Sequence, residues 1–204
     1  MPVHLLPLEY WSELLNAIRA HSLSDVKNLL PHCDATHKNN QALYLAVHLG
    51  NPQIVEMLLN AVPHKDWGNL LFDAVAQNHW AAAEVLLNNG LFTFEELQSA
   101  LCVAIHNHAH DTIEVLCPHL PQSVLAWGVV WSGDTWPSTD PMFSALFSHM
   151  SLPPLALMNW SGQPFSEVRK AKIEQTVEQA YAQFTKDQIL PHVEEGVLHR
   201  PRRI

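Results

Sequence analysis

The residues of this chain best suited to chemistry are His106, His108, His110 and Asp111, which stand within six positions of one another. Imidazole nitrogens and carboxylate oxygens are the ligands that zinc and similar metal ions prefer in proteins. A metal ion held by them could activate a water molecule for attack on a substrate. One hypothesis is therefore a metal-dependent hydrolase.

The surroundings of this cluster favour a different interpretation. The string is similar to the H-x-H-x-D-H motif of metallo-β-lactamase-like hydrolases, but its last two residues are in reversed order and the flanking sequence does not read as β-strands. His108 occupies a position that other parts of the chain fill with turn-forming residues. We therefore favour a structural turn, keep metal binding by the cluster as the alternative, and expect no cofactor.

Other catalytic patterns are missing from the sequence. No G-x-S-x-G elbow occurs, and the seven glycines form no phosphate-binding loop. Cys102 and Cys117 stand at apolar positions, where they are expected to be buried small hydrophobic residues. We therefore expect a non-catalytic chain.

The elements that must carry these residues repeat along the chain. Each unit is built on an alanine, with a leucine three positions before it and an apolar pair twelve and thirteen positions after it. The alanines are Ala17, Ala46, Ala74 and Ala104, and the pairs are Leu29-Leu30, Leu58-Leu59, Leu86-Leu87 and Leu116-Cys117. Repetition at this period indicates stacked units, and the spacing predicts two short amphipathic helices in each.

The turn inside each predicted hairpin is marked by residues that tolerate a left-handed backbone. Four positions after the alanines stand His21, Gly50, Asn78 and His108. Ser22, Asn51 and Asp111 are then expected to cap the second helices of their units. Thr93 with Glu96 has the pattern of a capping box for the first helix of the fourth unit.

Residues 43–51 followed by 54–59, Leu-Tyr-Leu-Ala-Val-His-Leu-Gly-Asn and Ile-Val-Glu-Met-Leu-Leu, resemble the two-helix core of an ankyrin repeat. The resemblance extends over residues 10–120. It implies an all-α, ankyrin-like solenoid of stacked helical hairpins that binds another protein, and it is compatible with a bacterial effector or the regulator of one. Two features depart from the family: Gln41-Ala42-Leu43-Tyr44 replaces the Thr-Pro-Leu-His opening, and the units are shorter than about 33 residues.

The sequence changes character after the fourth unit. Residues 118–164 hold seven of the fourteen prolines and four of the seven tryptophans. Trp131-Ser132-Gly133 and Trp160-Ser161-Gly162 predict degenerate fifth and sixth hairpins, the fifth interrupted by a loop over 134–141. A longer helix over 166–189 would cap the stack. We expect one continuous domain, with repeats in 1–120, degenerate repeats in 121–164, and the capping helix and basic tail in 165–204.

Composition and charge exclude several classes of function. The formal net charge of −9 argues against a nucleic-acid binder, and no apolar run approaches the length of about 20 residues that a membrane helix needs. Arg200, Arg202 and Arg203 are expected to form a solvated tail. Three cysteines without C-x-x-C spacing favour a cytoplasmic setting, including a host cytoplasm after delivery. We expect no membrane insertion and a monomer in isolation.

Repeated positions line up into columns that a partner protein can contact at several points. The columns two and three positions after the alanines predict a binding surface that includes Arg19, His48, Leu49, Gln77, His106 and Asn107. Trp136, in the proline-bounded loop, is expected to be exposed and to serve as a second contact.

Overall fold

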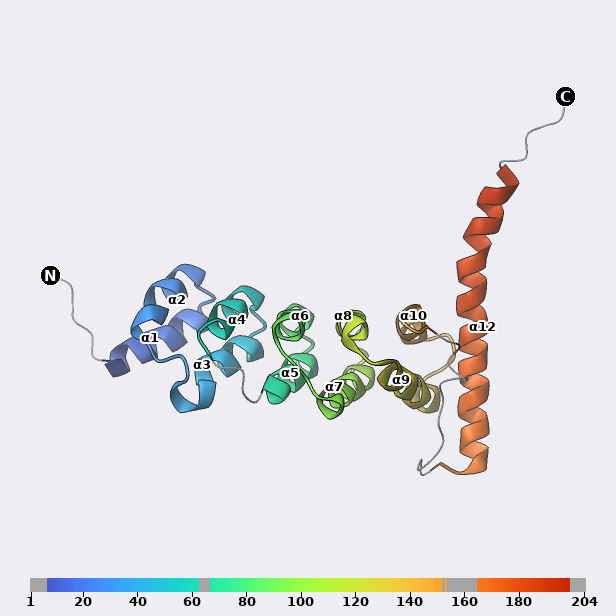
Figure 1. Cartoon of the computed structure of the whole chain (residues 1–204), viewed down its shortest axis with the longest axis horizontal. Coiled ribbons are helices and arrows are strands. Elements are labelled where there is room, and N and C mark those ends of the chain that lie inside the picture. The colour runs from blue at the N-terminus through green and yellow to red at the C-terminus, as the bar shows by residue number, and fades with distance from the viewer. Residues whose placement is uncertain (1–6, 63–66, 152, 154–164, 199–204) are drawn as a thin grey trace. The chain divides into compact units, whose positions relative to one another are not determined.

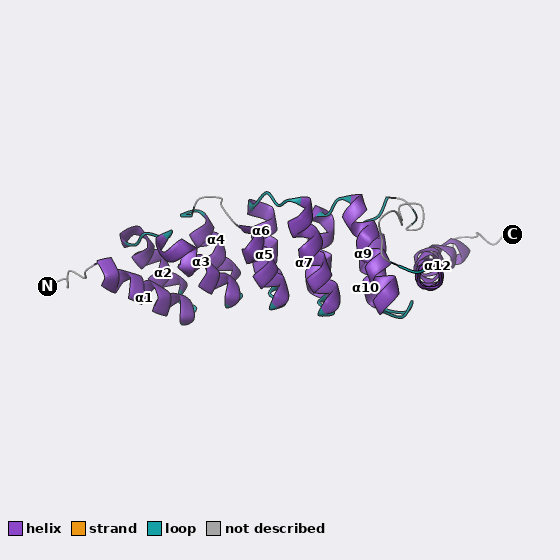
Figure 2. Cartoon of the chain, turned by 90° about the horizontal axis from the view of Figure 1, so that it is seen from below, coloured by secondary structure: helices purple, strands orange, loops and turns teal. Residues whose placement is uncertain are grey.

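The prediction of an all-α chain is confirmed. The computed structural model describes residues 7–62, 67–151, 153 and 165–198, and every regular element within these ranges is a helix (Figures 1 and 2). The chain divides into two compact units, Met1–His119 and Leu120–Ile204.

The first unit contains four helical hairpins. Their helices are α1 (Pro7–Arg19) with α2 (Leu23–Leu29), α3 (His37–His48) with α4 (Pro52–Leu59), α5 (Trp67–Ala76) with α6 (Trp80–Asn89), and α7 (Phe94–His106) with α8 (His110–Leu116). Short 3₁₀ helices follow α2 (Leu30–His32) and α8 (Cys117–His119).

The four hairpins pack on one another in chain order, which gives two layers. The first helices of the hairpins, α1, α3, α5 and α7, contact their neighbours in one layer, and α2, α4, α6 and α8 do so in the other (Figure 1). Ala46, Ala74 and Ala104 are completely buried, and Ala17 is 7% exposed. A small residue at this position allows adjacent first helices to approach closely.

All four turns inside the hairpins have the same backbone geometry. The predicted left-handed residues His21, Gly50, Asn78 and His108 have φ values of 53°, 68°, 57° and 52°, which confirms the prediction. In each turn the following residue donates its backbone N–H to the carbonyl of the repeat alanine, as in Ser22 to Ala17 at 3.0 Å. This is the Schellman arrangement, in which carbonyl groups at the end of a helix find partners.

The helix caps agree with the sequence at three positions and differ at one. Ser22 and Asn51 accept the backbone N–H groups of Asp25 and Ile54, and both hydrogen bonds of the Thr93–Glu96 capping box are present. The prediction that Asp111 caps α8 is wrong. The fourth turn is as short as the others, so α8 already begins at His110 and Asp111 lies inside its first turn.

The second unit contains α9 (Gln122–Thr135), α10 (Pro141–Ser148) and α12 (Glu167–Leu198), each in contact with the other two. The helix predicted over 166–189 is therefore present and continues to Leu198. Ser132 and Gly133, from the segment that predicted the fifth hairpin, lie inside α9 near its end, and α12 packs closely against Gly133. Trp160-Ser161-Gly162, predicted to mark a sixth hairpin, lies outside the described residues.

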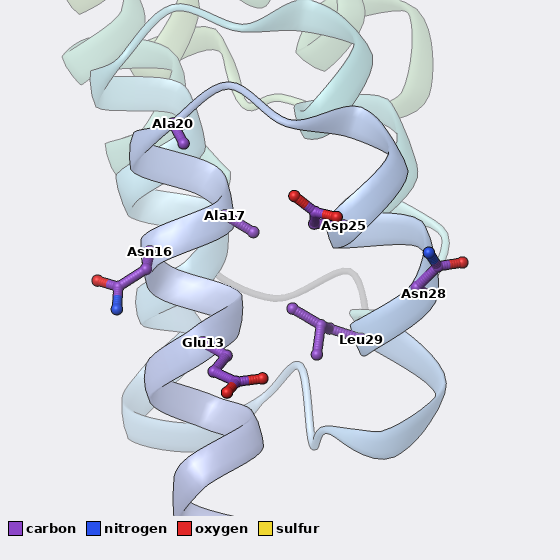
Figure 3. Close-up of a pocket in the computed structure, with 7 residues that line it drawn as sticks. All are labelled: Glu13, Asn16, Ala17, Ala20, Asp25, Asn28 and Leu29. Atoms are coloured by element: carbon purple, nitrogen blue, oxygen red, sulfur yellow. The ribbon is translucent and has the colours of Figure 1, made fainter. Parts of the chain in front are cut away.

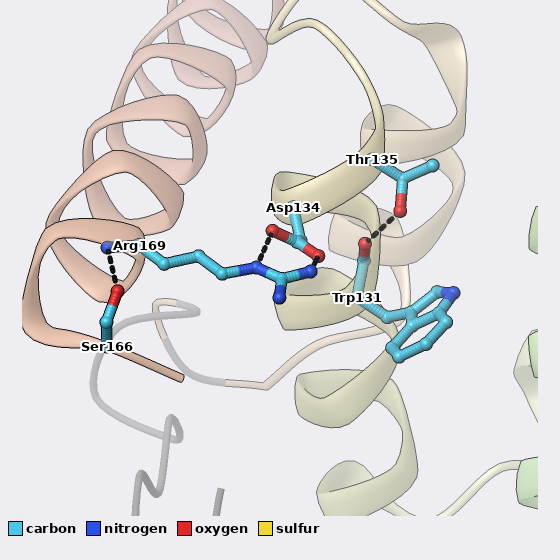
Figure 4. Close-up of polar contacts among 5 residues, drawn as sticks. All are labelled: Trp131, Asp134, Thr135, Ser166 and Arg169. Carbon is cyan, nitrogen blue, oxygen red and sulfur yellow. Dashed lines mark hydrogen bonds and ion pairs between the residues drawn. The ribbon is translucent and has the colours of Figure 1, made fainter. Parts of the chain in front are cut away.

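An ion pair joins α9 to the beginning of α12. Arg169 donates from Nε to Asp134 Oδ1 at 2.7 Å and from Nη2 to Asp134 Oδ2 (Figure 4). The Arg169 guanidinium also lies 4.8 Å from the centre of the Phe165 ring. Ile173 and Val177, further along α12, are completely buried. Polar and apolar contacts thus fix α12 against α9.

Candidate interaction surface

An apolar row runs along the layer of first helices in the first unit. Two positions before each repeat alanine stand Leu15, Tyr44, Phe72 and Cys102. Phe72 is 47% exposed, and the other three are half-buried. This row was not among the predicted contacts, although an apolar residue at the same place in all four units is a signal visible in the sequence.

The predicted polar column lies on the same layer. Positions two before and two after the alanine are four residues apart, so they share one helical face. Arg19, His48, Gln77, His106 and Asn107 are exposed, whereas Leu49 is half-buried. The structure therefore places most of the predicted binding residues beside the apolar row.

Several polar groups of this column bind other parts of the first unit. Asn107 donates from Nδ2 to the carbonyl oxygen of Ala76 at 3.3 Å, and Arg19 donates to Asn16 Oδ1 at 3.1 Å. His48 Nδ1 lies 3.4 Å from Asp73 Oδ2. The Asn107 amide thus links the third and fourth hairpins, which reduces what it can offer to a partner.

A second set of hydrogen bonds links the hairpin turns. Asn51 donates to His21 Nδ1 at 3.2 Å, and Thr112 donates from Oγ1 to Asn78 Oδ1 at 2.9 Å. His79 Nε2 lies 3.0 Å from the carbonyl oxygen of His48, which can only accept, so Nε2 carries the proton. Every pair of adjacent hairpins is therefore joined by a polar contact near the turns, which favours a preformed surface.

The histidine cluster is distributed over a turn and two helix ends. His106 is the last residue of α7, His108 is the left-handed turn residue, and His110 and Asp111 begin α8. The rings of His108 and His110 have centroids 6.3 Å apart. His106 and Asp111 do not join His108 and His110 in a set of ligand atoms close enough to hold one metal ion.

Trp136 does not have the predicted exposure. It follows α9 as the C-cap residue and is half-buried, with its indole nitrogen buried. Trp127 and Trp131, on successive turns of α9, stack on each other with centroids 5.6 Å apart. The tryptophan-rich segment thus contributes to packing inside the second unit, and Trp136 is a weaker candidate contact than the row in the first unit.

The cysteines lack the features of activated nucleophiles. Burial raises the pKa of Cys117 to about 12, and nearby Glu114 adds to the increase. Burial also raises the pKa values of Cys33 and Cys102, with Glu13 adding to the effect on Cys33. A thiol reacts as its thiolate, so all three shifts reduce reactivity.

Comparison with protein-family models gave no match, and neither curated proteins nor solved structures yielded a similar chain. Among the described helices, none combines the length and the apolar character required to cross a membrane.

Proposed function

We propose that this chain is a non-catalytic interaction module of the ankyrin-repeat type, which binds a partner protein through the layer of first helices. The observation that carries the proposal is the row of Leu15, Tyr44, Phe72 and Cys102 across four consecutive hairpins. Partly exposed apolar side chains gathered on one face are typical of surfaces that bind proteins.

The composition of the row and its surroundings supports this function. Tyr44 and Phe72 stand at the two central hairpins, and large aromatic side chains at the centre of an interface provide much of its binding energy. His48 and His106 lie beside the row and are exposed, so they can supply polar contacts at its edge. Affinity would come from the aromatic anchors and specificity from the polar edge.

The ankyrin-like character of the module rests on the repeated spacing and on the hairpin stack. Four hairpins with identical Schellman turns and linked neighbours would present a largely preformed surface. A preformed surface loses little conformational entropy on binding. The three free cysteines fit a reducing compartment, so we place this function in a cytoplasm.

The test is affinity capture with a surface variant and a matched control. Tyr44→Ser with Phe72→Ser removes both aromatic anchors, and Gln53→Ser with Asn88→Ser makes two changes at exposed positions on the other layer. We expect wild type and control to capture the same partner, and the anchor variant to lose it while keeping its helicity. A partner retained by the anchor variant would contradict the proposal.

A further inference from the structure

An open groove of about 430 Å³ lies between α1 and α2 in the first hairpin (Figure 3). Ala17, Ala20 and Leu29 are its apolar lining residues (Figure 3). Glu13 on α1 and Asp25 on α2 bring carboxylates to its opposite sides (Figure 3). The groove therefore combines an apolar base with two anionic walls.

The positions that correspond to Glu13 and Asp25 can be compared in the other three hairpins. The position of Glu13 is filled there by Ala42, Leu70 and Ala100, and that of Asp25 by Ile54, Ala82 and Thr112, all at most 1% exposed. These residues are covered in the stack. In the first hairpin the same positions hold charged groups, and burying them under another apolar hairpin face would leave two carboxylates without compensation. Both carboxylates are exposed, so the groove can accept a cationic occupant.

The chemistry of the groove matches an arginine side chain. The aliphatic part of arginine can lie on Ala17 and Leu29, while its guanidinium donates to carboxylates in a planar, bidentate manner. Glu13 has no hydrogen-bond or ion-pair partner among the described residues. Asp25 accepts a hydrogen bond from Ser22 at 2.6 Å through Oδ2.

We propose that this groove binds the arginine-rich end of a second copy of this chain, which carries Arg200, Arg202 and Arg203. The chain has 20 acidic and 11 basic residues, and three of the basic residues are concentrated in its last five positions. That concentration makes the tail the cationic segment that best complements the two carboxylates. The argument is one of charge complementarity and shape, because the tail itself lies outside the described residues.

The length of the tail is sufficient for this contact. Residues 199–204 follow the last residue of α12, and six extended residues span about 20 Å. A helix with its side chains is about 10–12 Å across, so the tail can follow the groove between α1 and α2. Each copy offers one groove and one tail, so the contact joins different surfaces and builds rings or open chains of copies. This departs from the expectation of a monomer.

The experiment is sedimentation equilibrium of the full chain at low salt, at concentrations up to about 1 mM, because a few exposed ion pairs give weak association. Four proteins are compared: wild type; a tail variant with Arg200→Ser, Arg202→Ser and Arg203→Ser; a groove variant with Glu13→Gln and Asp25→Asn; and a control with Glu56→Gln and Glu84→Gln, which neutralises two exposed carboxylates elsewhere. We expect association of wild type and control, and association at least about tenfold weaker in the tail and groove variants.

Charge reversal provides an independent test of the proposed contact. One protein carries Glu13→Lys and Asp25→Lys, and the other carries Arg200→Glu, Arg202→Glu and Arg203→Glu. Neither should associate alone, but an equimolar mixture should, because each groove then meets a tail of opposite charge. A wild type that remains monomeric throughout, a tail variant that associates like wild type, or a mixture that fails to associate would each overturn the proposal. The tail variant decides the question if the groove variants lose stability.

Discussion

The imidazole of His79 lies directly over Gly50 of the preceding hairpin. A Cβ atom added to Gly50 would stand 2.4 Å from His79 Nδ1, closer than non-bonded atoms approach. The ring is held there because its Nε2 donates to the carbonyl of His48 at 3.0 Å. Gly50 also has a φ of 68°, so two independent features require glycine at this turn.

Gly50→Ala is therefore expected to destabilise the first unit by about 2–4 kcal/mol. The left-handed backbone accounts for about 1–2 kcal/mol, and the collision with His79 for the remainder. Urea unfolding followed by circular dichroism measures this difference. In a His79→Ala background the same substitution should lose about 1–2 kcal/mol, because the collision is gone. Equal losses in both backgrounds would show that the ring does not lie over Gly50.

A second contact between neighbouring turns predicts a smaller effect. The hydroxyl of Thr112, a completely buried residue, donates to Asn78 Oδ1 at 2.9 Å. Thr112→Val removes this hydrogen bond with little change in volume and is expected to lower the free energy of unfolding by about 1 kcal/mol. Thr112→Ser keeps the hydroxyl and serves as the control for loss of the methyl group. If Thr112→Val lowers the free energy of unfolding by the same amount in an Asn78→Ala background, this account is contradicted.

The sequence was sufficient to predict the local structure of the first unit. The alanine period, the left-handed positions and the caps at Ser22, Asn51 and Thr93 all depend on residues close together in the chain. Asp111 was predicted as the cap because its side chain fits a capping pattern, but it is the second residue of the helix. Local patterns of this kind locate an element, but they locate its ends less accurately.

Contacts between hairpins could not be predicted in the same way. Glycine at position 50 follows from the turn, but the ring of His79 above it depends on the packing of two hairpins. The exposure of Trp136 was mispredicted for a similar reason, because proline-rich flanking sequence does not reveal what covers a side chain. The row through Tyr44 and Phe72 is visible in the sequence as a repeated apolar position, but its partial exposure depends on how the helices pack.

The ion pair between Asp134 and Arg169 predicts a dependence of stability on pH. Hydrogen bonds from Arg169 lower the pKa of the Asp134 carboxyl, and its positive charge and that of Lys172 add to this. A carboxyl whose pKa is lower in the folded state stabilises that state fully above its ordinary pKa of about 3.9. This stabilisation is lost as the pH falls through the lowered value.

Asp134→Asn should therefore lower the melting temperature of the protein at pH 7, and the difference from wild type should shrink as the pH falls below about 4. Thermal unfolding followed by circular dichroism at several pH values measures it. Glu167→Gln is the matched control, because the Glu167 side chain is 89% exposed in its pair with Lys170. A difference between wild type and Asp134→Asn that stays constant down to pH 2 would mean that the ionised carboxylate is not what stabilises this contact.

The close approach of α12 to α9 predicts that Gly133 cannot be enlarged. A Cβ at Gly133 would lie 2.9 Å from Val177 Cγ2 and 3.0 Å from Ile173 Cγ2, and both side chains are completely buried. Gly133→Ala gains up to about 1 kcal/mol of helix propensity, but overpacking of this kind loses about 1–3 kcal/mol. We expect net destabilisation, measured by urea unfolding. Addition of Val177→Ala should recover part of the loss, and its failure to do so would place the collision elsewhere.

The three thiols should differ sharply in reactivity. Cys117 is 2% exposed and its pKa is raised to about 12, so at pH 8 only about one molecule in 10⁴ carries the thiolate there. Cys33 and Cys102 are half-buried and have smaller barriers to reagent access. We expect a disulfide reagent to label two cysteines in the native protein and the third only after denaturation, with mass spectrometry identifying the sites. A Cys117→Ser variant should lose only the denaturation-dependent label. Labelling of Cys117 in the native protein at the rate of Cys33 would show that the end of α8 opens readily and is not the packed end of the fourth hairpin.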